Sequence, residues 1–235
     1  MATYNGAPYI ERQLRSILSQ LAQADEVILV DDHSSDATLD VVARIGDARI
    51  RIYRNDFNEG ITRTFERSLR QASGDVIFLS DQDDIWYPEK VKKFIEVFDS
   101  RPDVTLVLSD AKIINDSDEI VAESYLETRG GFSAGIWHNI IKNKYLGCTM
   151  AFRRAMLDTF LPIPKDVPMH DVWIGCINSI YGKPYILKAP LMGYRRHQYN
   201  ATPSRRRGMT HILAGRWKLV KNLCLKLMAG NNAVR

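Results

Sequence analysis

The chain has 235 residues, of which 45% are hydrophobic and 26% are charged, values that predict one globular domain or one domain with a small appendage. Polar residues interrupt every apolar run, which excludes a membrane-spanning helix of roughly 20 apolar residues, and no secretory signal is evident. The three cysteines, Cys148, Cys176 and Cys224, are odd in number and widely spaced, which indicates reduced thiols and a cytoplasmic location.

The net charge of +4 is distributed unevenly along the chain. Residues 172–235 contain 12 Lys and Arg residues and no Asp or Glu, so this end carries a formal charge of +12. Residues 1–171 hold all 28 acidic residues and the other 20 basic residues, which gives −8. Such a split predicts that the basic end faces an anionic partner such as phosphate, nucleic acid or membrane headgroups.

Short apolar runs alternate with helical patterns through the first half of the chain. The runs are rich in β-branched residues and predict strands at 26–31, 49–53, 75–80 and 104–109. The intervening segments predict helices at 8–22, 36–45, 61–72 and 88–99. This alternation predicts a parallel sheet with helices on both faces, in which ligands bind beyond the carboxyl ends of the strands. Residues 1–6 have the character of a strand end and its loop, so most of a first strand is expected to be missing.

The second half of the chain has a less regular pattern. It predicts a helix at 134–143, a strand at 146–152, a helix at 171–182, a strand at 184–194 and a last helix at 211–229. In the last helix one apolar face is formed by Leu213, Trp217, Val220, Cys224 and Leu227. We expect this helix to pack on the domain, while its nearby lysines leave binding to a membrane surface or to a partner as alternatives.

The strongest local signal is Ser80-Asp81-Gln82-Asp83-Asp84, directly after the predicted strand 75–80. Three carboxylates within four residues repel one another unless a cation or donor groups compensate. Oxygen ligands favour Mg²⁺ or Mn²⁺, which proteins hold through one or two carboxylates while substrate phosphates and water complete the shell. A solvated turn that caps the next helix is the alternative, but the position after a buried strand favours a cation site.

Two other segments carry candidate carboxylates. Asp31 and Asp32 end the predicted strand 26–31, where either can accept a hydrogen bond from a base imide or a ribose hydroxyl. Asp171 precedes an apolar helical run, and a carboxylate at that position acts either as a helix cap or as a general base.

His197 follows two arginines at 195 and 196 near the end of the predicted strand 184–194. A lone histidine is more often structural. Near a diphosphate, however, it could ligate a metal ion while the arginines neutralise phosphate charge.

Together these segments resemble the family 2 glycosyltransferases, which have the GT-A fold, and especially their bacterial rhamnosyltransferase-like branch. The similarity covers roughly residues 2–200. Its residues are Ala2-Thr-Tyr-Asn-Gly6, Val30-Asp31-Asp32 with Ser35-Asp36, Asn58-Glu-Gly60, Gly74-Asp75, Leu79-Ser-Asp-Gln-Asp-Asp84 with Trp86, His170-Asp171 with Trp173, and Tyr194-Arg-Arg-His197 with Asn200. The resemblance implies an α/β, Rossmann-like domain over 1–200 with a mostly parallel central sheet flanked by helices, followed by a basic loop and an amphipathic helix over 201–235.

The resemblance also implies roles for individual residues. The nucleotide-sugar pocket is implied to contain Thr3, Tyr4, Asn5, Asp31, Asp32, Asp81 and Asp83. Asp171 is implied as the catalytic base, and the implied ligands of Mn²⁺ or Mg²⁺ are Asp83, Asp84 and His197. The implied reaction is an inverting transfer of a sugar, with rhamnose as the expectation for the branch, from a nucleotide diphosphate sugar to a hydroxyl of a glycan or lipid-linked acceptor in cell-surface polysaccharide synthesis.

Two other functions are left open by the sequence. A nucleotidyltransferase acting on sugar phosphates would share the nucleotide-binding head and the metal, but residues 5–8 do not supply its usual glycine-rich phosphate loop. A non-catalytic nucleic-acid-binding protein is suggested by Arg205, Arg206 and Arg207. The favoured hypothesis has no nucleic-acid partner, and it leaves open peripheral contact with the inner face of the membrane through the last helix.

Overall fold

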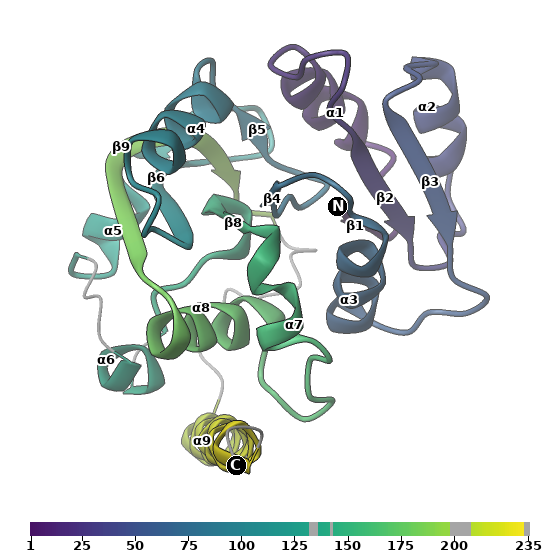
Figure 1. The fold of residues 1–235 in the computed structure, drawn as a ribbon. Coiled ribbons are helices and arrows are strands. Elements are labelled where there is room, and N and C mark those ends of the chain that lie inside the picture. The colour runs from purple at the N-terminus through teal and green to yellow at the C-terminus, as the bar shows by residue number, and fades with distance from the viewer. Residues whose placement is uncertain (132–135, 142, 198–207, 233–235) are drawn as a thin grey trace.

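The structure is a computed structural model that describes residues 1–131, 136–141, 143–197 and 208–232 (Figure 1). Part of the predicted helix 134–143, the motif residue Asn200 and the arginine run 205–207 lie outside the described residues. Among the described residues, no helix combines the length and the apolar character needed to cross a bilayer.

The first third of the chain forms a three-stranded parallel sheet in the order β1-β2-β3, with β1 at Ala2–Thr3, β2 at Val27–Asp31 and β3 at Ile50–Arg54. Three helices connect and cover these strands: α1 at Ile10–Leu18, α2 at Thr38–Ile45 and α3 at Ile61–Gln71. In α1 the apolar residues recur at helical spacing, and Ile10, Leu14 and Ile17 are buried against the sheet. The predicted α/β alternation is therefore confirmed in this region (Figure 1).

A second sheet has six strands, in the order β4-β8-β6-β9-β5 with β7 paired to β6. Its strands are β4 at Val76–Phe78, β5 at Ile85–Trp86, β6 at Leu106–Ile114, β7 at Ile120–Ala122, β8 at Met150–Arg153 and β9 at Pro184–Arg195. Only β6 and β9 pair in parallel here, while the other described pairings are antiparallel. This sheet is mixed rather than mostly parallel, because β8 returns directly between β4 and β6 and the two-residue strand β5 pairs with β9.

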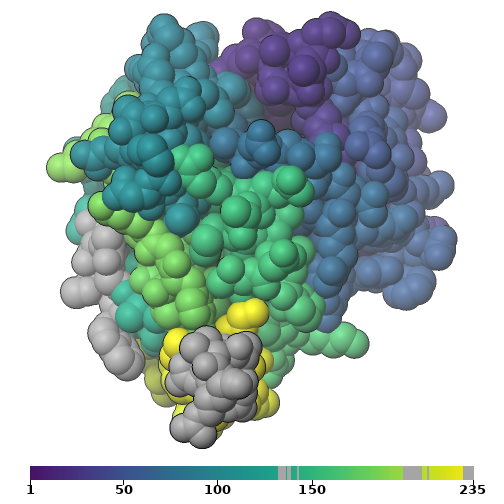
Figure 2. Space-filling model, viewed as in Figure 1, coloured from purple at the N-terminus to yellow at the C-terminus, as the bar shows by residue number. Residues whose placement is uncertain are grey.

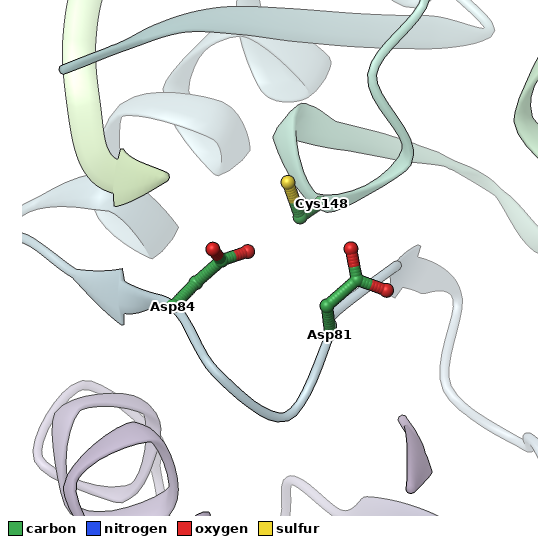
Figure 3. Close-up of side chains that lie close together, drawn as sticks. All are labelled: Asp81, Asp84 and Cys148. Atoms are coloured by element: carbon green, nitrogen blue, oxygen red, sulfur yellow. The ribbon is translucent and has the colours of Figure 1, made fainter. Parts of the chain in front are cut away.

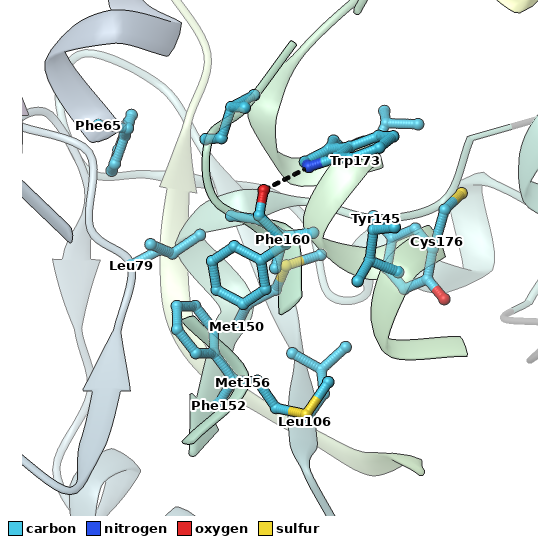
Figure 4. Packing of buried hydrophobic residues seen from close by; sticks show 14 of the residues in the cluster. Phe65, Leu79, Leu106, Tyr145, Met150, Phe152, Met156, Phe160, Trp173 and Cys176 are labelled. Carbon is cyan, nitrogen blue, oxygen red and sulfur yellow. Dashed lines mark hydrogen bonds between the residues drawn. The ribbon is translucent and has the colours of Figure 1, made fainter. Parts of the chain in front are cut away.

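The helices of the second half are α4 at Lys90–Ser100, α5 at Tyr125–Thr128, α6 at Ile136–Ile141, α7 at Leu157–Phe160, α8 at His170–Tyr181 and α9 at Met209–Asn232. The largest apolar cluster includes much of α8, and in it Trp173 belongs with residues of α3, β4, β6 and β8 (Figure 4). The indole Nε1 of Trp173 donates a hydrogen bond to the carbonyl of Phe160 at 2.8 Å. This packing fixes the first turn of α8, which carries His170 and Asp171.

The last helix packs on the domain through a face that the sequence did not indicate. Leu219 and Leu223 are 2% and 3% exposed and join the cluster around α8. Leu213 and Trp217, on the face predicted to pack, are 55% and 70% exposed. The helix carries two apolar rows, and Asn222, which donates to Asp166 at 2.7 Å, holds the Leu219 row toward the domain. The predicted packing is thus confirmed for the helix but wrong for its face, and α9 lies at one edge of the molecule (Figure 2).

Candidate active site

The ends of β1, β2 and β4 bring the motifs of the sequence to one side of the molecule. A cavity of about 430 Å³ lies there. Six of the ten predicted site residues line it, namely Thr3, Tyr4, Asp32, Asp81, Asp83 and Asp171. Asn5, Asp31, Asp84 and His197 lie outside this lining. Four segments more than 25 residues apart in the chain therefore converge on one pocket. Three of them follow strand ends, as expected for an α/β fold, and the fourth is the start of α8.

Gln82 joins the loop after β1 to the aspartate-rich turn. Its Oε1 accepts hydrogen bonds from Thr3 Oγ1 at 2.5 Å and from the Tyr4 amide at 2.8 Å, and its Nε2 donates to the Tyr4 carbonyl at 3.0 Å. A Cβ on Gly6 would lie 2.2 Å from Gln82 Oε1, so the glycine leaves room for this contact. No sequence signal indicated this role, because a glutamine between two aspartates is not a typical ligand or catalytic residue.

Asn5 and Asp31 shape the turn after β2 instead of lining the cavity. Asn5 has a positive φ of 47°, and its Oδ1 accepts from the Ser35 amide at 2.9 Å. Asp31 is fully buried and accepts from the Ser34 amide at 2.9 Å and the Ser34 hydroxyl at 2.5 Å. Both side chains thus bind the protein's own loop, and the nucleotide contact expected for them stays a prediction.

Asp32 lines the cavity with a carboxylate that is already bonded on both oxygens. Oδ1 accepts from Asn55 Nδ2 at 2.8 Å and from the Glu59 amide at 2.8 Å, and Oδ2 accepts from the Gly60 amide at 2.9 Å. Gly60 has φ +85°, a conformation that favours glycine. Since a carboxylate offers about four lone-pair positions, Asp32 keeps capacity for one further donor while it fixes the segment 58–60.

Asp171 lies in the first turn of α8 at the wall of the cavity. Burial raises the pKa of its carboxyl to about 6, although hydrogen bonds from the Val172 and Gly147 amides oppose the rise. Those bonds are 2.6 Å and 3.3 Å long. A carboxylate with a pKa near neutrality is ionised at pH 7 and basic enough to take a proton from a hydroxyl.

The aspartate-rich turn concentrates negative charge in a poorly solvated place. Burial, followed by the charges of Asp83 and Asp171, raises the pKa of Asp81 to about 7. Burial, followed by the charges of Asp83 and Asp81, raises the pKa of Asp84 well above its usual value. The carboxylates of Asp81 and Asp84 converge beside the thiol of Cys148 (Figure 3). Cation binding at this turn is favoured because it would offset that charge.

The predicted metal ligands divide into two groups. His197 Nε2 lies 2.7 Å from Asp83 Oδ2, so the structure brings these two together. Asp84 points instead toward Asp81 and Cys148, and its Oδ1 accepts from the Arg195 amide at 3.0 Å. The predicted set of Asp83, Asp84 and His197 is therefore not one cluster, because consecutive residues of this turn point in different directions.

The Asp83 and His197 pair fits Mn²⁺ or Mg²⁺, which accept one or two protein ligands and leave the other positions to phosphate and water. The cluster at Cys148 fits these hard cations less well. Its third group is a thiol, a soft donor that hard cations do not prefer, and burial raises the pKa of that thiol well above its usual value. Because the second cluster combines its two carboxylates with a thiol, the pair of Asp83 and His197 is the better site for these cations.

Lys90 is a charged residue of this region that the sequence did not single out, because it occurs in an ordinary helical pattern. It is fully buried, donates to the Cys148 carbonyl at 2.7 Å and lies 4.3 Å from the centre of the Trp86 ring. Burial lowers the pKa of its ammonium to about 8, against the opposing influence of Cys148, Asp84 and Asp81. Lys90 thus places positive charge behind the aspartate-rich turn.

Several solved structures share this architecture. The crystal structure of S. aureus TarS in complex with UDP-GlcNAc matches with a TM-score of 0.72 at 19% identity, over 97% of this chain and 65% of that one. The mannosyltransferase PcManGT from Pyrobaculum calidifontis, solved with GDP-Man and Mn²⁺, matches with a TM-score of 0.62 at 21% identity, over 87% of this chain and 56% of that one. At these identities the likeness establishes the fold, which is that of the GT-A glycosyltransferases.

The chain belongs to glycosyl transferase family 2, whose sequence model matches residues 1–161. The glucosyltransferase WfgD of Escherichia coli, named as acting on α-D-GlcNAc-diphosphoundecaprenol, is 28% identical over 164 residues, 68% of this chain and 61% of that protein. The dTDP-rhamnosyl transferase RfbG of Shigella flexneri is 26% identical over 225 residues, 85% of this chain and 72% of that protein. The chain thus spans about three fifths of WfgD. The predicted resemblance to rhamnosyltransferases is confirmed, because RfbG is one of the similar proteins.

Proposed function

We propose that the protein is an inverting glycosyltransferase that moves a sugar from a nucleotide diphosphate donor to a hydroxyl of a glycan or lipid-linked acceptor. One observation carries the proposal: a carboxylate with the pKa of a general base, Asp171, lines the same cavity as Asp81 and Asp83 and the loop of Thr3 and Tyr4. Membership of family 2 supports the transferase over a nucleotidyltransferase or a nucleic-acid-binding protein.

The chemistry is a single displacement. Asp171 takes the proton of the acceptor hydroxyl while the acceptor oxygen forms a bond to the anomeric carbon. The bond between that carbon and the donor phosphate oxygen breaks, and the electron pair leaves with the nucleoside diphosphate. Because the oxygen attacks from the face opposite the leaving group, the anomeric configuration inverts.

Asp83 and His197 are the residues proposed to hold Mn²⁺ or Mg²⁺. Such an ion, when bound, would act as a Lewis acid that offsets charge on the diphosphate. The 2.7 Å approach of the two side chains and the Mn²⁺ complex of PcManGT support this assignment. Asp81 and Asp32 contribute carboxylates to the remaining cavity wall, where they orient the donor.

The donor sugar is proposed to be rhamnose, carried on deoxythymidine diphosphate, on the strength of the similarity to RfbG. The decisive experiment screens the purified protein with a panel of nucleotide sugars that includes dTDP-rhamnose, UDP-glucose, UDP-GlcNAc and GDP-mannose, each with Mn²⁺ or Mg²⁺ or with a chelator. We expect a thermal shift and slow metal-dependent release of the nucleoside diphosphate with one donor. Absence of both signals across the panel would count against donor binding, and turnover that survives the chelator would count against the cation.

We also propose that α9 makes peripheral contact with the inner face of the membrane, which suits a lipid-linked acceptor and a cytoplasmic enzyme. The outward row of this helix carries Trp217, 70% exposed, and Met228, 64% exposed, beside the exposed Lys218 and Lys221. Apolar side chains flanked by cations bind at the boundary of anionic bilayers. The helix itself contributes no acidic residue that would oppose this contact, and the neighbouring Asp166 lies 3.9 Å from Lys221.

Liposome flotation tests the membrane contact. Vesicles rich in phosphatidylglycerol should carry the protein at low salt, while pure phosphatidylcholine vesicles should carry much less. Replacing Trp217 and Met228 with serine should abolish flotation, and Val121→Ser, at an exposed position on β7, serves as the matched control. Failure of the parent protein to float, or concentration-dependent dimers that need Trp217, would exclude the bilayer as the occupant of this face.

A further inference from the structure

Arg195 ends β9, beneath the aspartate-rich turn, and is 2% exposed. The sequence suggested that this side chain neutralises phosphate, but its guanidinium is committed to the protein. Nε donates to the Asp83 carbonyl at 2.7 Å and Nη1 donates to the Asn115 carbonyl at 2.6 Å, while Nη2 pairs with the carboxylate of Asp118. A buried guanidinium with these bonds is placed to hold protein segments together, not to contact a ligand in the cavity.

The partners of Arg195 belong to segments that are far apart in the chain. Asp83 lies in the turn after β4, whereas Asn115 and Asp118 form the turn between β6 and β7. The same turn accepts a hydrogen bond from the Tyr9 hydroxyl, through Asp116 Oδ1 at 2.9 Å. Arg195 therefore ties the aspartate-rich turn to a hairpin that has no side chain in the cavity lining.

Tyr9 contacts both Arg195 and His197, the residue whose imidazole faces Asp83. The guanidinium carbon of Arg195 lies 5.3 Å from the centre of the Tyr9 ring. The His197 ring stacks on the same Tyr9, with ring centres 4.9 Å apart and an interplanar angle of 19°. Cation–π contact and stacking restrict the Tyr9 ring, and through it the orientation of His197.

We propose that Arg195 is a positioning residue that sets the relative placement of Asp83 and His197 and so determines the affinity of this pair for a divalent cation. The inference rests on the proposed function in one respect, the assignment of the pair as the cation site. The planar fork of arginine suits this role because it bonds two carbonyls and a carboxylate at fixed angles, which a lysine ammonium does not reproduce. Outer partners of metal ligands commonly change metal affinity by about 10- to 100-fold when they are replaced.

The test measures Mn²⁺ binding to the purified full chain without donor, by electron paramagnetic resonance of the free ion. Arg195→Lys should weaken Mn²⁺ binding by about tenfold, at the low end of the range for outer partners. Asp118→Asn, which alters the far end of the same contact, should weaken it several-fold. Arg12→Gln removes the other cation that pairs with Asp118, at a mostly exposed position, and should leave affinity unchanged. Asp83→Ala serves as the reference for loss of binding.

Circular dichroism establishes that each variant is folded, and Asp118→Asn carries the test if Arg195→Lys does not fold. The double variant should bind Mn²⁺ no more weakly than Arg195→Lys alone, because both changes break one contact. Unchanged Mn²⁺ affinity in folded Asp118→Asn and Arg195→Lys, with binding lost in Asp83→Ala, would overturn the positioning role and leave the proposed function intact. Absence of Mn²⁺ binding in the parent protein would overturn the cation site itself.

Discussion

The three-stranded parallel sheet and the six-stranded mixed sheet both reach the cavity, but they supply different kinds of group. On the parallel side, Asp32 and the loop of Thr3 and Tyr4 are bonded to backbone amides and to Gln82. On the mixed side, Asp81 and Asp171 occupy poorly solvated positions that raise the pKa of each carboxyl. Under the proposed function, the first region would be a preformed wall for the nucleotide, and the second would hold the reactive carboxylates in poorly solvated environments.

The largest expected effect falls on the mixed side. Asp171→Asn keeps the shape of the side chain and removes the base, so we expect kcat to fall by about 10²- to 10⁴-fold, the usual worth of general base catalysis. Donor affinity, measured by titration calorimetry, should remain close to that of the parent protein. Asp158→Asn, at an exposed site, is the matched control. Full turnover in Asp171→Asn would contradict the assignment of the catalytic base to the side of the mixed sheet.

A second prediction concerns the packing that holds α8. Trp173→Ala should lower the free energy of unfolding by about 3–5 kcal/mol, because it opens a cavity in the largest apolar cluster and frees the Phe160 carbonyl. Trp217→Ala, on the exposed row of α9, should change it by less than about 0.5 kcal/mol. Urea unfolding followed by circular dichroism measures both variants. Equal losses in the two would mean that α8 does not depend on this core.

The third prediction, of intermediate size, concerns how activity and stability depend on pH through Asp171. The pKa of Asp171 is raised to about 6, so kcat/KM should fall about tenfold per pH unit below that value as the base takes up a proton. The contribution of Asp171 to the free energy of unfolding changes with pH in the opposite direction. The folded state retains the Asp171 proton up to a higher pH than the unfolded chain, so this group stabilises the fold at low pH and the contribution is lost as pH rises through about 4 to 6.

Urea titrations at pH 4.5 and pH 7 measure this contribution. Asp171→Asn cannot ionise, so the part of the stability difference that belongs to this carboxyl should be missing from the variant. The same pH profile in parent and variant would show that burial does not perturb Asp171.

The smallest predicted effect concerns the loop of Thr3 and Tyr4, beside the parallel sheet. Gln82→Ala removes three hydrogen bonds to the loop of Thr3 and Tyr4, so donor affinity should weaken by about tenfold or less while kcat changes little. Gln23→Ala, at an exposed position after α1, is the control. An effect on kcat without an effect on donor affinity would indicate that Gln82 acts in the catalytic step and not in ordering the loop of Thr3 and Tyr4.

The sequence predicted the longer helices and strands of the fold and the gathering of its strand-end acids, because apolar periodicity and the position of a carboxylate after a strand are local properties. It could not predict which way neighbouring side chains point. Asp83 and Asp84 are consecutive, yet one faces His197 and the other faces Cys148. That difference depends on the pairing of β5 with β9, which is a contact between residues more than 100 positions apart.

The same limit applies to charges and helix faces. Arg195 and Lys90 are buried by elements distant in sequence, so nothing near them in the chain distinguishes them from surface cations. In α9 two apolar rows compete, and the choice of the Leu219 row depends on the shape of the cluster around α8. Mixed pairing in the second sheet likewise escaped prediction, because alternating strands and helices do not specify the direction of β8.

The bonds of Asp32 to the amides of Glu59 and Gly60 have a consequence for the end of the catalytic cycle. The protein's own hydrogen bonds order this wall, so a nucleotide bound there, as the proposed function requires, would meet the same surface before and after the sugar has departed. The spent nucleoside diphosphate should then dissociate slowly and compete with fresh donor, and its departure, in place of bond making, would set the steady-state turnover.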